Sequence, residues 1–223
     1  MLSLAEELLL IALDNEKGTV SGFIELSLHY SLGGAILFEL YQAHLIELDE
    51  KSKVVVSQSA GQNQLLENQA EIGGVLESIA SEKRHRKIKY WIDEIGASAK
   101  KYAKITLDQL VKKNVLKLEH KTIQWVVPNE IFPDQEYSAK FGLKEVLRKI
   151  VFAGDKADLR RVALLTFLRA SRLIDFVFTH DELRTARKKI DQFLNEDLGA
   201  KDREVLKDIE SAIFTNITLN TSR

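Results

Sequence analysis

Apolar residues at helical spacing run through most of this chain, and they constrain its fold more than any other feature. Ser3 followed by Glu6 is a capping-box pattern, which marks the start of a helix. The apolar spacing after it predicts an amphipathic helix over residues 4 to 13. Its apolar face is formed by Leu4, Leu8 and Ile11.

Helical patterns also account for most of the remaining sequence. The further helices are predicted over residues 22 to 45, 62 to 80, 83 to 113 and from Ser138 onward. We expect an interruption at Gly33 and Gly34, and breaks near Gly154, Thr179 and Gly199. Pro128 and Pro133 bracket the one clear loop of the sequence.

Two helix ends are each followed by a pattern typical of a β hairpin. The first pattern consists of residues 45 to 48, a polar turn at 49 to 52, and residues 54 to 56. The second consists of a helix end at 110 to 118, which aligns with residues 40 to 48, a turn at 119 to 121 and a strand at 122 to 127. Each unit resembles a winged-helix element. We therefore predict a mainly α fold, a single helical domain spanning residues 1 to 223 around a helical core with short β hairpins.

Charge is distributed unevenly along the chain. Residues 1 to 82 carry 3 basic and 13 acidic groups, whereas residues 83 to 104 carry 8 and 2, and residues 140 to 172 carry 9 and 3. A folded molecule with this pattern can present a basic face beside an acidic one, which is typical of proteins that bind the phosphates of lipid or nucleic acid. The alternative is that both basic blocks are ordinary solvated helix faces.

Composition excludes several classes of protein. The chain has no Cys, which excludes disulfide scaffolds, thiolate zinc sites, iron-sulfur ligation and a Cys nucleophile. Its 45% hydrophobic content excludes a mainly disordered chain. No apolar run reaches the roughly 18 to 20 residues that a membrane-spanning helix needs. The first residues carry acids where a secretory signal carries positive charge, so a cytoplasmic location is expected.

No catalytic pattern is visible in the sequence. The glycine pairs at 33 to 34 and 73 to 74 do not follow strands or lead into a phosphate-binding loop. The five His residues are scattered, and only His180 has carboxylates beside it. We therefore expect a protein that is not an enzyme, with no metal site and no cofactor.

Six segments, in order along nearly the whole chain, resemble the Golgi phosphoprotein 3 family. They are residues 2 to 18, 32 to 40, 91 to 94, 110 to 116, 158 to 165 and 170 to 174. The resemblance implies a single mainly helical domain decorated with short hairpins. It also implies a peripheral membrane protein that binds the headgroup of phosphatidylinositol 4-phosphate, with cytosolic protein tails as further partners.

The resemblance also implies where a headgroup would bind. The aromatic position of the family site corresponds to Phe23, and its basic positions correspond to Gly33, Lys100 and Ala103, with Lys104 adjacent to the last. The lipid-binding residues are therefore expected to be Phe23, Gly33, Lys100, Lys101 and Lys104. Lys100 and Lys104 share a helical face at i, i+4, so that two ammonium groups can converge on one phosphate. A supporting basic patch is expected at Lys83, Arg84, Arg86 and Lys87.

The family hairpin that supports self-association corresponds to residues 119 to 130. The residues expected to form a homo-oligomer there are Glu119, Ile123, Trp125 and Val127. Two alternatives to membrane binding stay open. One is a winged-helix-like regulator that binds nucleic acid through the basic patch, which the near-zero net charge and the lack of a recognition helix disfavour. The other is a protein-interaction scaffold.

Overall fold

The computed structural model describes residues 1–14, 19–20, 22–58, 70–117, 119–120, 130–131 and 137–221, and it is mainly helical, as predicted. The elements of the first half are α1 (Leu4–Ala12), α2 (Gly22–Gln42), β1 (Ile46–Leu48), β2 (Lys53–Val56), α4 (Ala70–Ser81), β3 (Arg86–Lys87), α5 (Ile88–Ala97) and α6 (Ala99–Lys112). The second half contains β4 (Glu119–His120), β5 (Glu130–Ile131), α7 (Tyr137–Arg148), the π-helical turn η1 (Lys149–Ala153), α8 (Leu159–Ala170), the 3-10 turn η2 (Leu173–Phe176), α9 (Leu183–Gln192), the π-helical turn η3 (Phe193–Asp197) and α10 (Ala200–Thr221).

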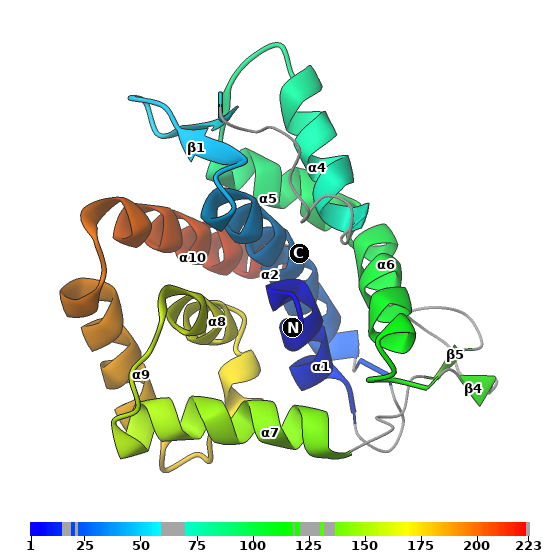
Figure 1. Cartoon of the computed structure of the whole chain (residues 1–223), viewed down its shortest axis with the longest axis vertical. Coiled ribbons are helices and arrows are strands. Elements are labelled where there is room, and N and C mark those ends of the chain that lie inside the picture. Colours follow the sequence, from blue (N-terminus) through cyan, green and yellow to red (C-terminus); the bar gives the residue numbers. More distant parts are fainter. Residues whose placement is uncertain are drawn as a thin grey trace.

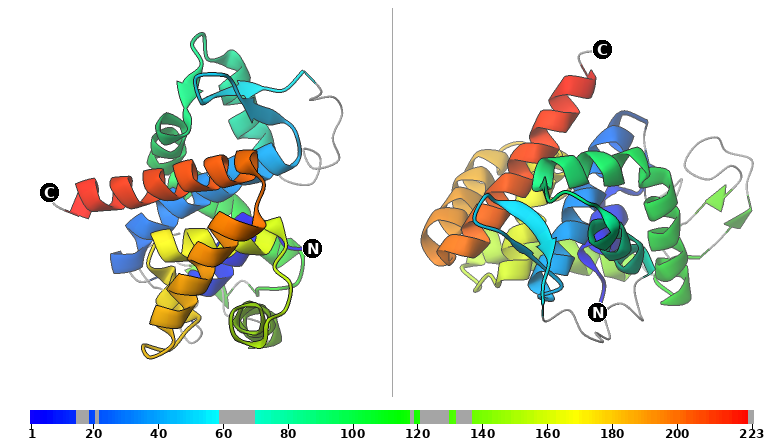
Figure 2. Two further views of the ribbon diagram at one scale, coloured as in Figure 1. Left: turned by 90° about the vertical axis from the view of Figure 1, so that its left-hand side faces the viewer. Right: turned by 90° about the horizontal axis from the view of Figure 1, so that it is seen from above.

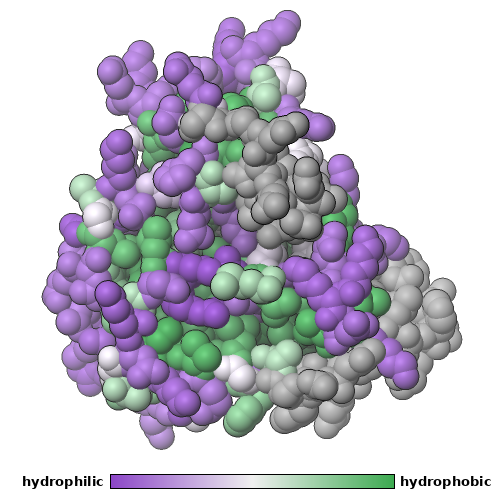
Figure 3. Space-filling model, in the orientation of Figure 1, coloured by the Kyte–Doolittle hydropathy of each residue, from purple (hydrophilic) through white to green (hydrophobic). Residues whose placement is uncertain are grey.

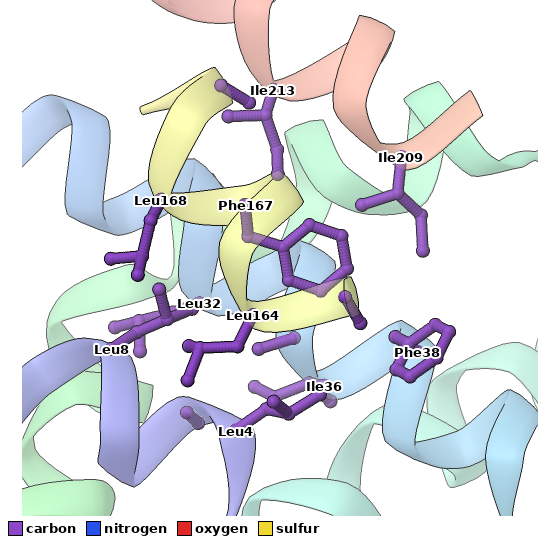
Figure 4. Packing of buried hydrophobic residues seen from close by; sticks show 14 of the residues in the cluster. Leu4, Leu8, Leu32, Ile36, Phe38, Leu164, Phe167, Leu168, Ile209 and Ile213 are labelled. Atoms are coloured by element: carbon purple, nitrogen blue, oxygen red, sulfur yellow. The ribbon is translucent and has the colours of Figure 1, made fainter. Parts of the chain in front are cut away.

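Helix α2 crosses the centre of the molecule, and other helices pack around it (Figure 1). Its helical neighbours are α1, α4, α5, α6, α8 and α10. Figure 4 shows side chains of α1, α2, α8 and α10 meeting in the core. The rings of Phe38 and Phe167 make an edge-to-face contact there, with 5.9 Å between the ring centroids. The buried apolar side chains form one cluster that draws on most helices. The predicted helical core is therefore present.

The glycine pair does not interrupt α2, contrary to the prediction. At Gly34, a Cβ atom would lie 2.8 Å from side-chain atoms of both Ile209 and Ile213 on α10. At Gly33, it would touch the Ile95 side chain of α5 at 3.4 Å. The pair therefore lets two helices approach the backbone of α2, and the packing gained there offsets the low helix propensity of glycine.

Helix α1 begins as predicted but is buried on every side, so the expectation of an amphipathic helix is wrong. Both halves of the capping box are formed, with Ser3 Oγ accepting from the Glu6 N–H and the Glu6 carboxylate accepting from the Ser3 N–H. Glu6 and Glu7 are nonetheless 1% and 3% exposed. Acids can occupy such positions only when other groups neutralise them.

Cations from distant parts of the chain neutralise these buried acids. Lys113 Nζ donates to Glu6 at 2.7 Å, and Arg161 Nη1 donates to Glu7 Oε1 at 2.9 Å. Arg160 bridges Glu7 at 3.3 Å and Glu39 of α2 at 3.1 Å. Segments 2–18, 32–40, 110–116 and 158–165, four of the six that carry the family resemblance, thus contribute a network that locks α1 against α2, the end of α6 and α8.

The first predicted hairpin is confirmed and belongs to a three-stranded antiparallel sheet in the order β1-β2-β3. Its turn is held by Asp49, whose Oδ1 accepts from the N–H groups of Lys51 and Lys53 at 2.9 Å each. Strand β3 pairs with β2. Residues 86–87 are therefore extended, and the prediction of a helix there is wrong. The helix expected from 83 to 113 is instead divided into α5 and α6 by Ser98.

The two helix ends that align in sequence also share their geometry. His44 and Asn114 both have φ of 56°, and the N–H of the following residue donates to the carbonyl five positions before it, at 2.9 Å in each case. After the second end, β4 pairs with β5. Residues 119–120 therefore form a strand, and the prediction of a turn at these residues is wrong. The strand predicted over residues 122 to 127 lies outside the described residues.

In the last third of the chain the predicted breaks are present. Gly154 ends η1 with φ of 79°, which a glycine adopts without strain. Residues 177–182 separate η2 from α9, and Gly199 lies between η3 and α10. A further break after α8 has no glycine to signal it, because Arg172 itself adopts φ of 61°. The end of α10 projects beyond the rest of the molecule (Figure 2).

Candidate functional site

Three predicted site residues lie together on the first half of α6. Lys100, Lys101 and Lys104 are all exposed, whereas Tyr102 and Ala103 between them are buried against the core. Lys100 and Lys104 lie one turn apart on the same face of the helix, as the i, i+4 spacing requires. Helix α6 thus presents these three ammonium groups to solvent, and their binding of a lipid headgroup stays a prediction.

The neighbouring part of α2 adds two residues that the sequence analysis missed. His29 Nε2 lies 3.4 Å from Glu25 Oε1. Burial raises the pKa of the Glu25 carboxyl, which the positive charge of Lys100 opposes. Burial lowers the pKa of His29, and Lys100 lowers it further. An acid and an imidazole therefore lie near Lys100. In the sequence, the i, i+4 spacing of Glu25 and His29 is the signal that could have identified this pair.

The two other predicted headgroup contacts are placed differently. Phe23 lies in the first turn of α2, and its side chain is outside the described part of the chain. Gly33 lies in the interface between α2 and α5, next to Ile92 and Ile95. Ten helical residues, or about 15 Å along the axis, separate these two positions. The structure does not bring Gly33 to the surface that carries the α6 lysines.

The supporting basic patch forms a second cationic surface instead of extending the first. Lys83 and Arg84 lie on the loop before β3, and Arg86 and Lys87 form β3 itself. Helix α5, which is ten residues and about 15 Å long, separates this patch from α6. Figure 3 shows hydrophilic side chains crowded at the end of the molecule that carries the sheet.

Acidic groups partly neutralise this second surface. Arg86 lies 3.7 Å from Glu82, and its guanidinium group stacks over the ring of Tyr90 at 4.8 Å. His85 Nδ1 lies 3.3 Å from Asp49 Oδ2. The pKa of Asp49 is lowered, chiefly because its carboxylate accepts the N–H of Lys53. The patch therefore has less free positive charge than its sequence suggests.

The residues predicted to support self-association are mostly outside the described part of the chain. Glu119 lies in β4, where it pairs with Ile131 of β5. Ile123, Trp125 and Val127 belong to the segment between these strands that the structure does not describe. Oligomerisation through this hairpin thus stays a prediction.

The described residues lack two features that would define a class of protein. They contain no group of three or more His, Cys, Asp or Glu side chains placed to hold a metal ion. None of their helices is both long enough and apolar enough to cross a bilayer.

The fold and these surfaces define a mainly helical protein in which α6 presents a row of exposed lysines. The chain belongs to the Golgi phosphoprotein 3 (GPP34) family, whose model matches residues 4–213. Among curated proteins, no sequence matches the chain. Membership of this family fits a lipid-binding, non-enzymatic role.

Proposed function

We propose that this protein is a non-enzymatic peripheral membrane protein that binds anionic phospholipid headgroups through the first half of α6. The observation that carries the proposal is the row of exposed ammonium groups on Lys100, Lys101 and Lys104. These lysines occupy the segment of the chain that contains Lys100 and Ala103, to which two of the three basic positions of the family's headgroup site correspond. Through the family resemblance, phosphatidylinositol 4-phosphate is the headgroup that we propose.

The strength of such an attachment follows from its charges. Each basic residue near an anionic membrane contributes about 1 kcal/mol, so three lysines would favour the bound state on the order of a hundredfold. Salt screens interactions of this kind over roughly 8 to 10 Å at physiological ionic strength. We therefore expect reversible binding that weakens as salt is added.

The side chains present also set the expected selectivity. A lysine ammonium is a point charge, whereas the arginine guanidinium is a planar fork that recognises phosphate through two parallel hydrogen bonds. A surface built from lysines should discriminate among phosphates mainly by their charge. Glu25 lies close enough to Lys100 to affect its electrostatics and should weaken the attraction. We expect a preference for the more highly charged inositide and measurable binding to other anionic lipids.

Sedimentation with vesicles that differ only in headgroup tests this proposal. Neutral, generic anionic and phosphatidylinositol 4-phosphate vesicles are compared at low salt for the wild type and for Lys100→Ala combined with Lys104→Ala. The matched control combines Lys188→Ala and Lys201→Ala, which removes the same charge from exposed positions on α9 and α10. We expect the first pair alone to abolish most retention. Equal loss in both pairs, or no retention of the wild type on any vesicle, would contradict the proposal.

A further inference from the structure

A hollow lies on the opposite side of the molecule from the α6 lysines. It has a volume of about 820 Å³ and is bounded by the end of α8, η2, α9 and α10. Figure 1 shows α9 on the left and α6 on the right of the central helices, and the right-hand view of Figure 2 agrees. Side chains that matter for its chemistry are Arg169, Arg172, Asp175, Arg187, Lys207 and Phe214.

The charge of Arg169 is already compensated within the fold. Its Nη1 lies 2.6 Å from Asp191 Oδ1 of α9, and its Nη2 lies 2.6 Å from Glu210 Oε1 of α10. Burial raises the pKa of Glu210, and Arg169 opposes that rise. Arg169 therefore joins the three helices that form the walls of the hollow, and it adds no free positive charge.

Three other cations in the hollow are exposed, and the charge of one of them, Lys207, helps to lower the pKa of Glu210. Among the described residues, no carboxylate lies within ion-pair distance of Arg172, Arg187 or Lys207. Lys207 Nζ donates instead to the neutral Asn195 amide oxygen at 2.8 Å. Asp175 is the remaining acid of the lining. The charged side chains that line the hollow are thus four cations, Arg169 included, against the two acids Asp175 and Glu210.

An aromatic side chain stands at the same hollow. Phe214 of α10 lines it and is 55% exposed, which is unusual for so large an apolar side chain. Exposed aromatic rings beside cationic groups provide a contact surface for a ligand that is part apolar and part anionic. The volume of the hollow falls within the range of about 300 to 1,000 Å³ that small-molecule sites occupy.

We propose that this hollow binds a phosphate monoester whose organic part is apolar. A phosphate monoester carries about two negative charges near pH 7, which matches the surplus of positive charge in the hollow. Two guanidinium groups, from Arg172 and Arg187, supply the forked donors that suit phosphate oxygens. The ring of Phe214 packs against the apolar part. None of the α6 lysines lines this hollow, so the proposal does not depend on membrane binding through α6.

Calorimetric titration of the full chain with phenyl phosphate at low salt tests the proposal. The variants are Arg187→Gln and Phe214→Ala, which change exposed side chains and should leave the fold intact. The matched control is Arg184→Gln, an exposed arginine one turn earlier on α9 that does not line the hollow. We expect Arg187→Gln to weaken binding about tenfold, as the loss of a hydrogen-bonded charge does. Arg184→Gln should leave the affinity unchanged.

Further ligands test the contribution of the apolar part of the ligand and distinguish a lipid phosphate from a small soluble one. Inorganic phosphate should bind more weakly than phenyl phosphate, and Phe214→Ala should remove that difference. Dihexanoyl phosphatidic acid below its micelle concentration represents a lipid source of the phosphate. Tighter binding of this compound than of phenyl phosphate supports a lipid ligand, and the reverse order supports a small soluble phosphate monoester. Absence of saturable binding by both organic phosphates, equal weakening by Arg184→Gln, or equal affinity for inorganic phosphate would each overturn the proposal.

Discussion

Replacing Gly34 by alanine should destabilise the protein, although alanine is the better helix former. In the middle of a helix, the exchange of glycine for alanine stabilises by about 1 kcal/mol when nothing obstructs the new methyl group. At Gly34 the new Cβ would lie 2.8 Å from both Ile209 Cγ2 and Ile213 Cδ1. Both isoleucines are fully buried, so neither side chain can move into open space.

The clash should outweigh the gain in helix propensity. Overpacking of a buried site costs about 1 to 3 kcal/mol, so a net loss of up to about 2 kcal/mol is expected for Gly34→Ala. Gly74 of α4 is the matched control, because a Cβ there meets nothing within 4 Å. Gly74→Ala should therefore stabilise by about 0.5 to 1 kcal/mol.

Urea denaturation followed by circular dichroism measures both changes in the free energy of unfolding. The midpoint should fall for Gly34→Ala and rise for Gly74→Ala, with unchanged slopes. If Gly34→Ala were as stable as the wild type, α10 would not pack against α2 as closely as described.

Three further predictions concern charged groups. Arg160→Ala leaves Glu39 buried without its ion pair, so unfolding free energy measured in urea should fall by about 3 to 5 kcal/mol. The Arg148 ion pair lowers the pKa of Glu182 to about 2, below its ordinary value of 4.5, so its stabilisation is complete above pH 4.5 and is lost as the pH falls towards 2. The free energy of unfolding of the wild type, measured as a function of pH, should show this loss. If Glu182→Gln lost the same stability over this pH range, the loss would not come from Glu182. Glu25→Gln should strengthen retention on anionic vesicles in sedimentation, because it removes a negative charge beside the α6 lysines; weaker retention would show that Glu25 has another role.

Local patterns correctly predicted those starts and ends of elements that depend on residues close in sequence. The capping box at Ser3 and Glu6 fixes the start of α1, and the polar turn around Asp49 fixes the first hairpin, because both depend on residues close in sequence. The aligned helix ends at His44 and Asn114 also share one geometry. These features need no knowledge of the tertiary structure.

Features that depend on distant partners could not be read from the pattern. Glu6 looks like a solvated residue until Lys113 and its neighbours are brought against it. Gly34 looks like a helix break until α10 packs on it. The basic residues near 83 and near 100 look like one cluster until α5 holds them apart. Each error has the same cause, which is that packing decides what a local pattern leaves open.

The claim that α6 faces the membrane can be tested by attaching an environment-sensitive fluorophore to it. The chain has no Cys, so Asp108→Cys gives a single label one turn beyond Lys104 on the lysine face, and Arg184→Cys gives the control on α9. With phosphatidylinositol 4-phosphate vesicles, emission at position 108 should become stronger and shift to shorter wavelength, while emission at position 184 should not change. A change at 184 with none at 108 would contradict the account.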